Sequence, residues 1–338
     1  MATQVPISLV KTPTSAASPD DSGLARNPGM ALDLQQLDKI RVNKSAVVRR
    51  CASYGVRRSI KKQQQAAWLL KAISLIDLTT LSGDDTQDRV KRLCSKAKQP
   101  VSAALQQRLG IESLNLATAA VCVYHEMLST ACDSLDGSGI HLAAVSTGFP
   151  AGLSPLPLRI AEIEYSVAAG ADEIDIVISR RHVLEGNWQA LYDEVKAFRN
   201  ACGSAHLKTI LATGELGNLA NVAKASMVCM MAGADFIKTS TGKEIENATL
   251  PVSLVMVRMI REYFLLTGFY IGFKPAGGVS DSKTALLYMT MMQEELGRRW
   301  LEADLFRFGA SSLLGDIERQ LDHYDSGYYS AAYRHAMA

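Results

Sequence analysis

Short apolar runs recur along the chain at a nearly regular interval. Eight such runs, rich in Val, Ile, Leu and Phe, begin near residues 74, 119, 142, 173, 206, 236, 271 and 305. The stretches between them have the composition and spacing of helices, among them 157–169, 188–201, 219–232 and 252–266. Strands that alternate with helices at this pitch indicate parallel β-α units.

Eight β-α units over ~240 residues predict an α/β fold of the closed (β/α)8 TIM-barrel type. A doubly wound open sheet is the alternative, but no G-x-G-x-x-G sequence follows the first strand. Residues 100–116 predict an additional helix inserted before the second strand. Residues 31–73 contain a long run of helix-forming residues and predict an N-terminal helical extension.

These patterns divide the 338 residues into four parts. Residues 1–30, biased toward Ser, Thr, Pro and Ala, predict a disordered leader. Residues 31–73 should pack on the barrel of residues 74–320, and residues 321–338 form a Tyr-rich tail. The leader lacks the apolar core of a signal peptide and carries two adjacent aspartates, so we expect a cytoplasmic protein.

The charge balance changes this picture little. Lys and Arg number 36 and Asp and Glu 34, and a net charge of +2 gives no reason to expect a nucleic acid partner. No apolar stretch reaches the ~18 residues of a membrane-spanning helix, so no membrane is expected either. The extension carries a basic patch without the interleaved aromatic residues of single-strand binders, which favours a solvated helix face: Arg49, Arg50, Arg57, Arg58, Lys61 and Lys62.

Cysteine and histidine spacing indicates neither a disulfide framework nor a metal site. No C-x-x-C pair and no H-E-x-x-H sequence occurs, so we expect no metal and no cofactor. We expect six buried free thiols, as in a reducing compartment: Cys51, Cys94, Cys122, Cys132, Cys202 and Cys229.

Charged residues interrupt strands that should be hydrophobic on both faces. Lys208, Lys238 and Lys274 lie on three successive predicted strands. Asp175 lies on the strand before them, and Asp77 lies on the first. One buried lysine could belong to a structural ion pair. Three lysines and two carboxylates at one barrel mouth indicate a functional site.

A cluster of buried amines has a specific chemical use. An ordinary lysine, with a pKa near ~10.4, is protonated at neutral pH and is not nucleophilic. Burial and a second ammonium lower that pKa, so a neutral amine can attack a carbonyl and form a Schiff base. A carboxylate or the second amine then moves the protons. The residues therefore predict class I aldolase chemistry.

Glycine and serine follow the last three strands. Gly242 follows the sixth strand, Gly277 and Gly278 follow the seventh, and Ser311 and Ser312 end the eighth. Backbone N–H groups and hydroxyls at these positions bind phosphate in many barrels. Such residues also mark ordinary tight loops and helix caps. Their clustering beside the lysines favours the phosphate interpretation.

Several segments resemble the signature segments of the deoxyribose-phosphate aldolase family. They are GADFIKTSTGK (233–243), GFKPAGGV (272–279), FRFGASSLL (306–314), IDLTTLSGDDT (76–86), AAVCVY (119–124), GADEIDIVI (170–178) and HLKTILATGEL (206–216). The resemblance extends from about residue 32 to the C-terminus and is closest to the longer eukaryotic branch.

The resemblance implies a role for each matching residue. Lys238 would form the Schiff base, Lys274 would depress its pKa and transfer protons, and Asp175 would donate and accept the proton. The family's substrate contacts fall on Asp77, Cys122, Lys208 and Thr239, and its phosphate contacts on Gly242, Gly277, Gly278, Ser311 and Ser312.

The implied reaction is the reversible cleavage of 2-deoxy-D-ribose 5-phosphate to D-glyceraldehyde 3-phosphate and acetaldehyde, in deoxynucleoside breakdown. The implied partner is thus a small phosphorylated sugar. The oligomeric state stays open, a homo-oligomer included.

Some features depart from the family or stay open. His125 stands where the family usually has proline. Four tail tyrosines compete to reach the phosphate site: Tyr324, Tyr328, Tyr329 and Tyr333. Because a carboxylate beside Lys238 would keep it protonated, we expect Asp175 to lie nearer Lys274 or a bound water than Lys238.

Two other functions remain as alternatives. One is a different Schiff-base barrel that acts on a ketose phosphate, such as a transaldolase or a fructose-type aldolase. The other is a barrel used as a binding protein through its basic N-terminal helices. The complete lysine–aspartate set argues against the second.

Overall fold

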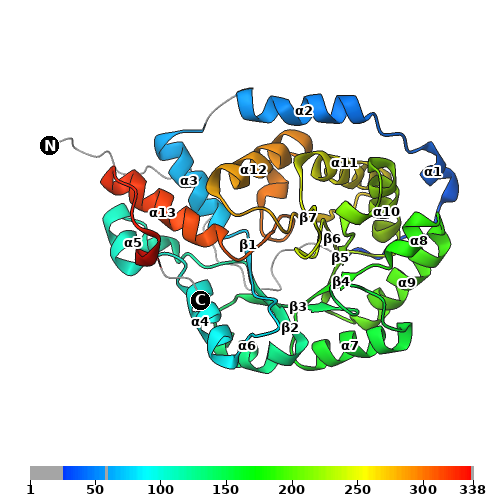
Figure 1. The fold of residues 1–338 in the computed structure, drawn as a ribbon, viewed down its shortest axis with the longest axis horizontal. Helices are drawn as coiled ribbons and strands as arrows, with labels where there is room; N and C mark the ends of the chain where they lie inside the picture. Colours follow the sequence, from blue (N-terminus) through cyan, green and yellow to red (C-terminus); the bar gives the residue numbers. More distant parts are fainter. Residues whose placement is uncertain (1–25, 58–59, 336–338) are drawn as a thin grey trace.

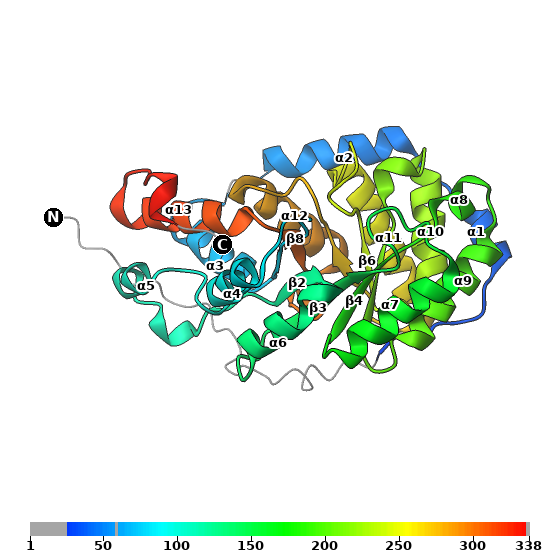
Figure 2. The ribbon, with the colours of Figure 1, turned by 60° about the horizontal axis from the view of Figure 1, so that its bottom comes forward.

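Eight parallel strands form the centre of the molecule, and helices surround them (Figures 1 and 2). The computed structural model describes residues 26–57 and 60–335, so most of the expected leader (1–30) lies outside the described residues. The strands are β1 Ile76–Thr79, β2 Ala120–Tyr124, β3 His141–Ser146, β4 Glu173–Val177, β5 His206–Ile210, β6 Phe236–Lys238, β7 Gly272–Lys274 and β8 Phe308–Ala310. Each coincides with one of the eight apolar runs.

The sheet closes on itself. Each strand from β1 to β6 pairs in parallel with the next, and β1 also pairs with β8. Backbone bonds join β7 to β8, since Arg307 N donates to Phe273 O (3.1 Å) and Gly309 N donates to Pro275 O (2.9 Å). The predicted (β/α)8 barrel is therefore confirmed, and the open doubly wound sheet is excluded.

The surrounding helices follow the strands in the expected order. They are α4 Gln87–Lys98, α6 Leu128–Leu135, α7 Leu156–Ala168, α8 Arg180–Leu184, α9 Trp188–Ala201, α10 Leu219–Met231, α11 Leu250–Thr267, α12 Ser282–Leu296 and α13 Leu313–Ser326, with 3-10 turns η2 His125–Met127, η3 Thr213–Glu215, η4 Arg298–Leu301 and η5 Ala332–Arg334. Side chains of Asn187, Asn218 and Asp281 cap α9, α10 and α12. These caps explain why the sequence marks the helix starts clearly.

The N-terminal extension consists of three helices, α1 Leu34–Lys39, α2 Lys44–Arg57 and α3 Lys62–Ile73. Helix α2 packs on α11 and α12, and α3 packs on α12 and α13 (Figure 1). Arg50, from the basic patch, pairs with Glu294 (2.8 Å) and Glu295 (2.9 Å) of α12. This patch residue thus helps to fix the extension on the barrel.

The additional helix predicted over 100–116 is wrong as a single element. The chain forms α5 Ala103–Leu109 and then a 3-10 turn, η1 Glu112–Leu114. Gly110 between them has φ +65°, a left-handed conformation that ends helices.

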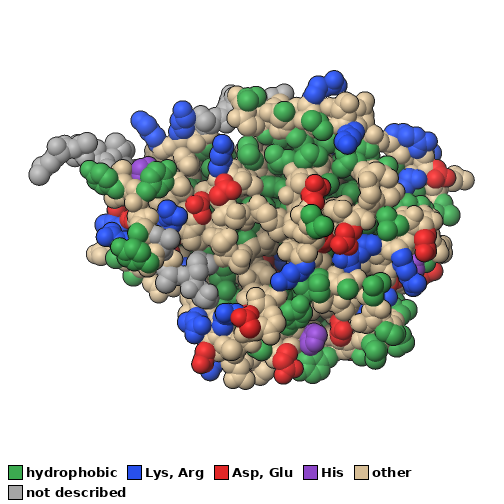
Figure 3. Space-filling model, viewed as in Figure 1, with side chains coloured by type: hydrophobic (Ala, Val, Ile, Leu, Met, Phe, Trp, Pro, Cys, Tyr) green, Lys and Arg blue, Asp and Glu red, His purple; other side chains and the backbone are tan. Residues whose placement is uncertain are grey.

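The surface bears charges of both signs. Figure 3 shows basic side chains interspersed with acidic ones on one face. Five of the six cysteines are buried free thiols as expected, but Cys132 is exposed on α6, so that part of the prediction is wrong. Among the described residues, no helix combines the length and apolarity that crossing a membrane requires.

Candidate active site

Five of the predicted site residues project into the barrel. Asp77, Asp175, Lys208, Lys238 and Lys274 alternate with outward-facing residues on their strands, and all are at most 3% exposed. The sheet register places Asp175 beside Lys208 on β4 and β5, and Lys238 beside Lys274 on β6 and β7. The structure thus brings together the charged residues that interrupt the predicted strands.

One carboxylate oxygen joins the two candidate catalytic amines. Asp175 Oδ2 accepts hydrogen bonds from Lys238 Nζ (2.6 Å) and from Lys274 Nζ (2.8 Å). The expectation that Asp175 lies nearer Lys274 is therefore wrong. Because Lys238 and Lys274 are register partners, their amines reach the same height in the barrel, and a single oxygen bridges both.

The two amines have opposite electrostatic surroundings. Burial is the largest effect on Lys238 and lowers its pKa; the Lys274 ammonium lowers it further, and Asp175 opposes both. Burial also disfavours the charged form of Lys274, but Asp175 and Asp77 outweigh it and raise the pKa. Lys238 is therefore the amine that loses its proton first, and Lys274 stays an ammonium.

The carboxylates remain ionised although they are buried. Burial opposes the ionisation of Asp175, but the ammonium groups of Lys238 and Lys274 hold its pKa below the usual range. The pKa of Asp77 is also held well below its usual range, chiefly by Lys208 and Lys274 against the effect of burial. Lys208 Nζ lies 3.4 Å from Asp77 Oδ2 and 3.6 Å from Asp175 Oδ1.

The sequence prediction missed two buried charged residues of this network. Arg307 donates from Nη1 to Asp77 Oδ1 (2.6 Å) and from Nη2 to Glu173 Oε1 (2.9 Å), and Glu173 also contacts Lys208. Both lie within apolar runs that the prediction identified as strands. The rule that selected the lysines, a charge inside a buried strand, applies to them equally and would have found them.

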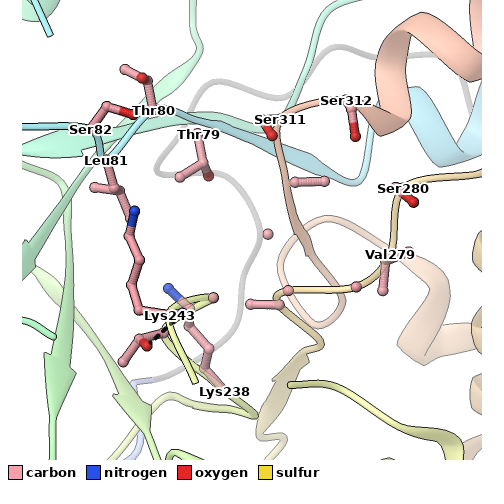
Figure 4. Close-up of a pocket in the computed structure, with 17 residues that line it drawn as sticks. Thr79, Thr80, Leu81, Ser82, Lys238, Lys243, Val279, Ser280, Ser311 and Ser312 are labelled. Carbon is pink, nitrogen blue, oxygen red and sulfur yellow. Dashed lines mark hydrogen bonds between the residues drawn. The ribbon is translucent and has the colours of Figure 1, made fainter. Parts of the chain in front are cut away.

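A cavity of about 340 Å³ opens beside Lys238 at the carboxyl ends of the strands. All five predicted phosphate residues line it: Gly242, Gly277, Gly278, Ser311 and Ser312. In Figure 4, Lys238 and Lys243 reach in from one side, and Ser280, Ser311 and Ser312 lie on the other. The prediction did not single out Lys243, Ser280 or the β1 loop residues Thr79–Ser82, which also line the cavity.

The cavity wall exposes backbone where a side chain would block it. Gly277 and Gly278 have φ +73° and +81°, a region that favours glycine. A Cβ on Gly277 would lie 2.7 Å from atoms of Asn247, so this position has no room for a side chain. Helix α13 begins at Leu313, directly after the serine pair, and its free N–H groups favour an anion. These features suit a phosphate group.

The cavity wall includes none of the four predicted substrate contacts, Asp77, Cys122, Lys208 and Thr239. The Thr239 hydroxyl donates to Ala276 O (3.2 Å) and accepts from Ala276 N (3.0 Å), so it ties β6 to the loop after β7. Cys122 is fully buried beside Ala143 and Val145, and burial raises the pKa of its thiol to about 11. Neither side chain lines the cavity, and their role as substrate contacts stays a prediction.

The features that depart from the family, or that the sequence left open, lie outside the cavity wall. His125 begins η2 and makes edge contacts with the rings of Tyr124 and Tyr165. Tyr328, Tyr329 and Tyr333 are exposed on the tail, and Tyr324 is partly buried on α13. None of the four lines the cavity. Across residues 26–57 and 60–335, no group of three or more His, Cys, Asp or Glu residues is arranged to hold a metal ion.

Comparison with known proteins gives a consistent result. Residues 71–317 match the profile of the DeoC/LacD family aldolases. The chain is 57% identical over 305 residues to the deoxyribose-phosphate aldolase of Mus musculus, covering 90% of this chain and 96% of that protein. It is 55% identical over 309 residues to that of Homo sapiens, covering 91% and 97%.

A solved structure shares the fold at lower sequence identity. The deoxyribose phosphate aldolase from Aeropyrum pernix, described as a tetramer, matches with a TM-score of 0.59 at 22% identity, over 83% of this chain and 99% of that one. At this identity the likeness concerns the barrel alone.

Proposed function

The chain belongs to the DeoC/LacD family of aldolases, and we propose that it cleaves 2-deoxy-D-ribose 5-phosphate reversibly through a Schiff base on Lys238. The products are D-glyceraldehyde 3-phosphate and acetaldehyde. One observation supports this proposal most: a buried lysine of lowered pKa shares a carboxylate oxygen with a second lysine, beside a cavity suited to phosphate.

Imine formation falls to Lys238. Its neutral amine attacks the C1 aldehyde of the open-chain sugar, and loss of water leaves an imine. Once protonated, the imine withdraws electrons from C2. Lys274 cannot replace Lys238 in this step, because Asp175 and Asp77 keep it protonated.

Asp175 moves the proton that carbon–carbon cleavage requires. Removal of the proton from the C3 hydroxyl lets the C2–C3 bond break, and the electron pair passes to C2 to give an enamine. D-glyceraldehyde 3-phosphate leaves at this point. Asp175 then returns a proton to C2, and water hydrolyses the imine to release acetaldehyde. Lys274, bonded to the same Asp175 oxygen, keeps the carboxylate in position throughout.

The phosphate end of the sugar binds in the glycine and serine loops. The amides of Gly242, Gly277 and Gly278, the hydroxyls of Ser311 and Ser312, and the N-terminus of α13 surround this part of the cavity. Lys243, which also lines it, supplies a positive charge. Anchoring the phosphate fixes which carbonyl reaches Lys238.

The wider setting of the reaction is also part of the proposal. A substrate of this kind places the enzyme in deoxynucleoside catabolism. The buried free thiols suit the cytoplasm, where disulfides are rare. Assembly into a homo-oligomer is a further proposal, supported by the tetramer of the Aeropyrum pernix relative.

Borohydride trapping tests the reaction. The protein is incubated with acetaldehyde or with dihydroxyacetone phosphate, reduced with borohydride, digested and analysed by mass spectrometry. We expect acetaldehyde to label Lys238. Labelling by dihydroxyacetone phosphate alone would instead indicate a ketose-phosphate aldolase, and no labelling by either compound would exclude Schiff-base chemistry.

A further inference from the structure

Arg307 and Glu173 form an ion pair in the barrel interior, below the residues to which the reaction has been assigned. Both are buried, and neither lines the cavity. Arg307 holds Glu173 with one guanidinium nitrogen (2.9 Å) and Asp77 with the other (2.6 Å). Its planar fork therefore fixes two carboxylates that come from opposite sides of the barrel, on β4 and β1.

A short series of contacts connects Arg307 with the candidate nucleophile. The second oxygen of Asp77, Oδ2, lies 2.5 Å from Lys274 Nζ. Lys274 in turn donates to Asp175 Oδ2 (2.8 Å), the oxygen that also bonds to Lys238 (2.6 Å). The way in which Arg307 and Lys274 share Asp77 therefore affects how strongly Asp175 interacts with Lys238.

The charged groups of the interior do not balance when all of them are ionised. Three acids face four bases, so full ionisation leaves an excess of one positive charge: Asp77, Glu173 and Asp175 against Lys208, Lys238, Lys274 and Arg307. An unbalanced charge in a buried site is costly. Loss of one proton from Lys238 removes the excess.

Three further titratable side chains, on β2, β3 and β5, interact with these residues. Cys122 on β2 interacts with Lys238, and burial keeps its thiol protonated by raising its pKa to about 11. His141 on β3 and His206 on β5 both interact with Glu173, whose pKa is held at about 2 by Arg307 and Lys208 against the effect of burial. Burial lowers the pKa of His206, which favours its neutral form. The ring of Phe236 lies 5.9 Å from the Arg307 guanidinium and carries no charge.

We propose that Arg307 and Glu173 are positioning residues that set the reactivity of Lys238 by fixing how Asp77 and Asp175 are shared among the lysines. The inference rests on the proposed function and extends it. Without Arg307, Asp77 is shared by Lys274 and Lys208 only and binds Lys274 more strongly. Asp175 then turns to Lys238, and the amine keeps its proton. When Glu173 is removed, Arg307 and Lys208 attract Asp77 more strongly and draw it away from Lys274. Asp175 then interacts more strongly with Lys274, and Lys238 loses its proton more readily.

A purely structural pair would behave differently. If Arg307 and Glu173 only held β8 to β4, their loss would lower stability without changing the pH at which Lys238 reacts. The chain offers a matched control in Arg159 and Glu194, a buried pair (2.7 Å) that joins α7 to α9 outside the barrel interior.

The experiment measures the rate of borohydride trapping by acetaldehyde as a function of pH. The acidic limb is the range in which this rate rises as Lys238 loses its proton. Arg307→Met should move it upward by at least about half a pH unit, and Glu173→Gln should move it downward by a similar amount. The double variant restores the balance and should return the limb to within about 0.2 units of wild type. Arg159→Met and Glu194→Gln should leave it in place.

Any other pattern overturns the proposal. Shifts of the same sign in both single variants, no shift, or equal shifts in the control pair would each show a structural role. If Arg307→Met fails to fold, Glu173→Gln and the double variant still test the proposal. The acidic limb should return to its wild-type position only when both charges are removed. Failure of the wild type to be labelled at Lys238 would instead refute the proposed function itself.

Discussion

Lys238 and Lys274 are direct register partners on β6 and β7, and their amines donate to the same oxygen of Asp175, at 2.6 and 2.8 Å. One carboxylate cannot neutralise two ammonium groups. Lys274 has a second carboxylate, Asp77, at 2.5 Å, whereas among the ion pairs of the described residues Lys238 has Asp175 alone. This geometry favours Lys238 over Lys274 as the proposed nucleophile.

Replacement of Lys274 by Leu should raise the pKa of Lys238. It removes the neighbouring ammonium and leaves Asp175 to Lys238, and both changes favour the protonated amine. The acidic limb of acetaldehyde trapping should move upward by at least about one pH unit, and trapping at high pH should persist. Lys274→Arg, which keeps a cation, should shift the limb less. An unchanged limb in Lys274→Leu would show that burial alone activates Lys238.

The barrel and its charged residues were predictable for one physical reason. A strand covered by helices is buried on both faces, so a charge inside its apolar run signals a polar barrel interior. The same rule applies to Arg307 and Glu173, which the prediction passed over. Gly110 shows a limit of the helical pattern, because helix-forming residues on both sides of it concealed the break at this left-handed position.

The sharing of Asp175 depends on geometry that a sequence does not contain. Spacing along the chain shows that Lys238 and Lys274 lie on neighbouring strands. It does not show that the two are at the same height, which follows from the β6–β7 register. Thr239 is a similar case. The family resemblance implies that it contacts the substrate, but its hydroxyl is bonded to the Ala276 backbone.

Replacement of Lys238 by Arg should abolish imine formation. Guanidinium stays protonated and cannot attack a carbonyl, while the positive charge beside Asp175 is retained. We expect kcat to fall by more than ~10³, the scale of other nucleophile losses, with the fold retained by circular dichroism. Trapping with acetaldehyde tests the assignment directly, since a labelled variant would mean that another lysine is the nucleophile.

The phosphate site can be tested with two substitutions at Gly278. Its φ of +81° makes any side chain strained there, so Gly278→Ala measures the cost of strain alone. Gly278→Glu adds a negative charge where we place the phosphate. It should raise KM for 2-deoxyribose 5-phosphate at least about tenfold beyond the alanine variant, a difference of ~1.4 kcal/mol. Turnover of 2-deoxyribose without phosphate should be similar in both variants. An equal loss of activity toward both substrates would show that this loop does not bind the phosphate.

The buried carboxylates should also make the free energy of unfolding depend on pH in the acidic range. Ion pairing with Arg307 and Lys208 lowers the pKa of Glu173 from 4.5 to about 2, against the effect of burial. A lowered pKa means that the stabilisation is fully present above the unfolded-state pKa, near ~4.3, and is lost as the pH falls toward 2. The corresponding free energy is on the order of 3 kcal/mol.

Glu173→Gln should therefore be less stable than wild type at pH 7, and the difference should shrink as the pH falls from 5 to 3. Glu194→Gln, whose carboxylate pairs with Arg159, controls for the loss of a buried glutamate outside the barrel interior. Urea unfolding of both variants and the wild type at pH 7, 5 and 3 gives the three free energies of unfolding at each pH. A constant difference between wild type and Glu173→Gln across this range would mean that Glu173 is not held ionised by the network, and that the variant loses stability through packing alone.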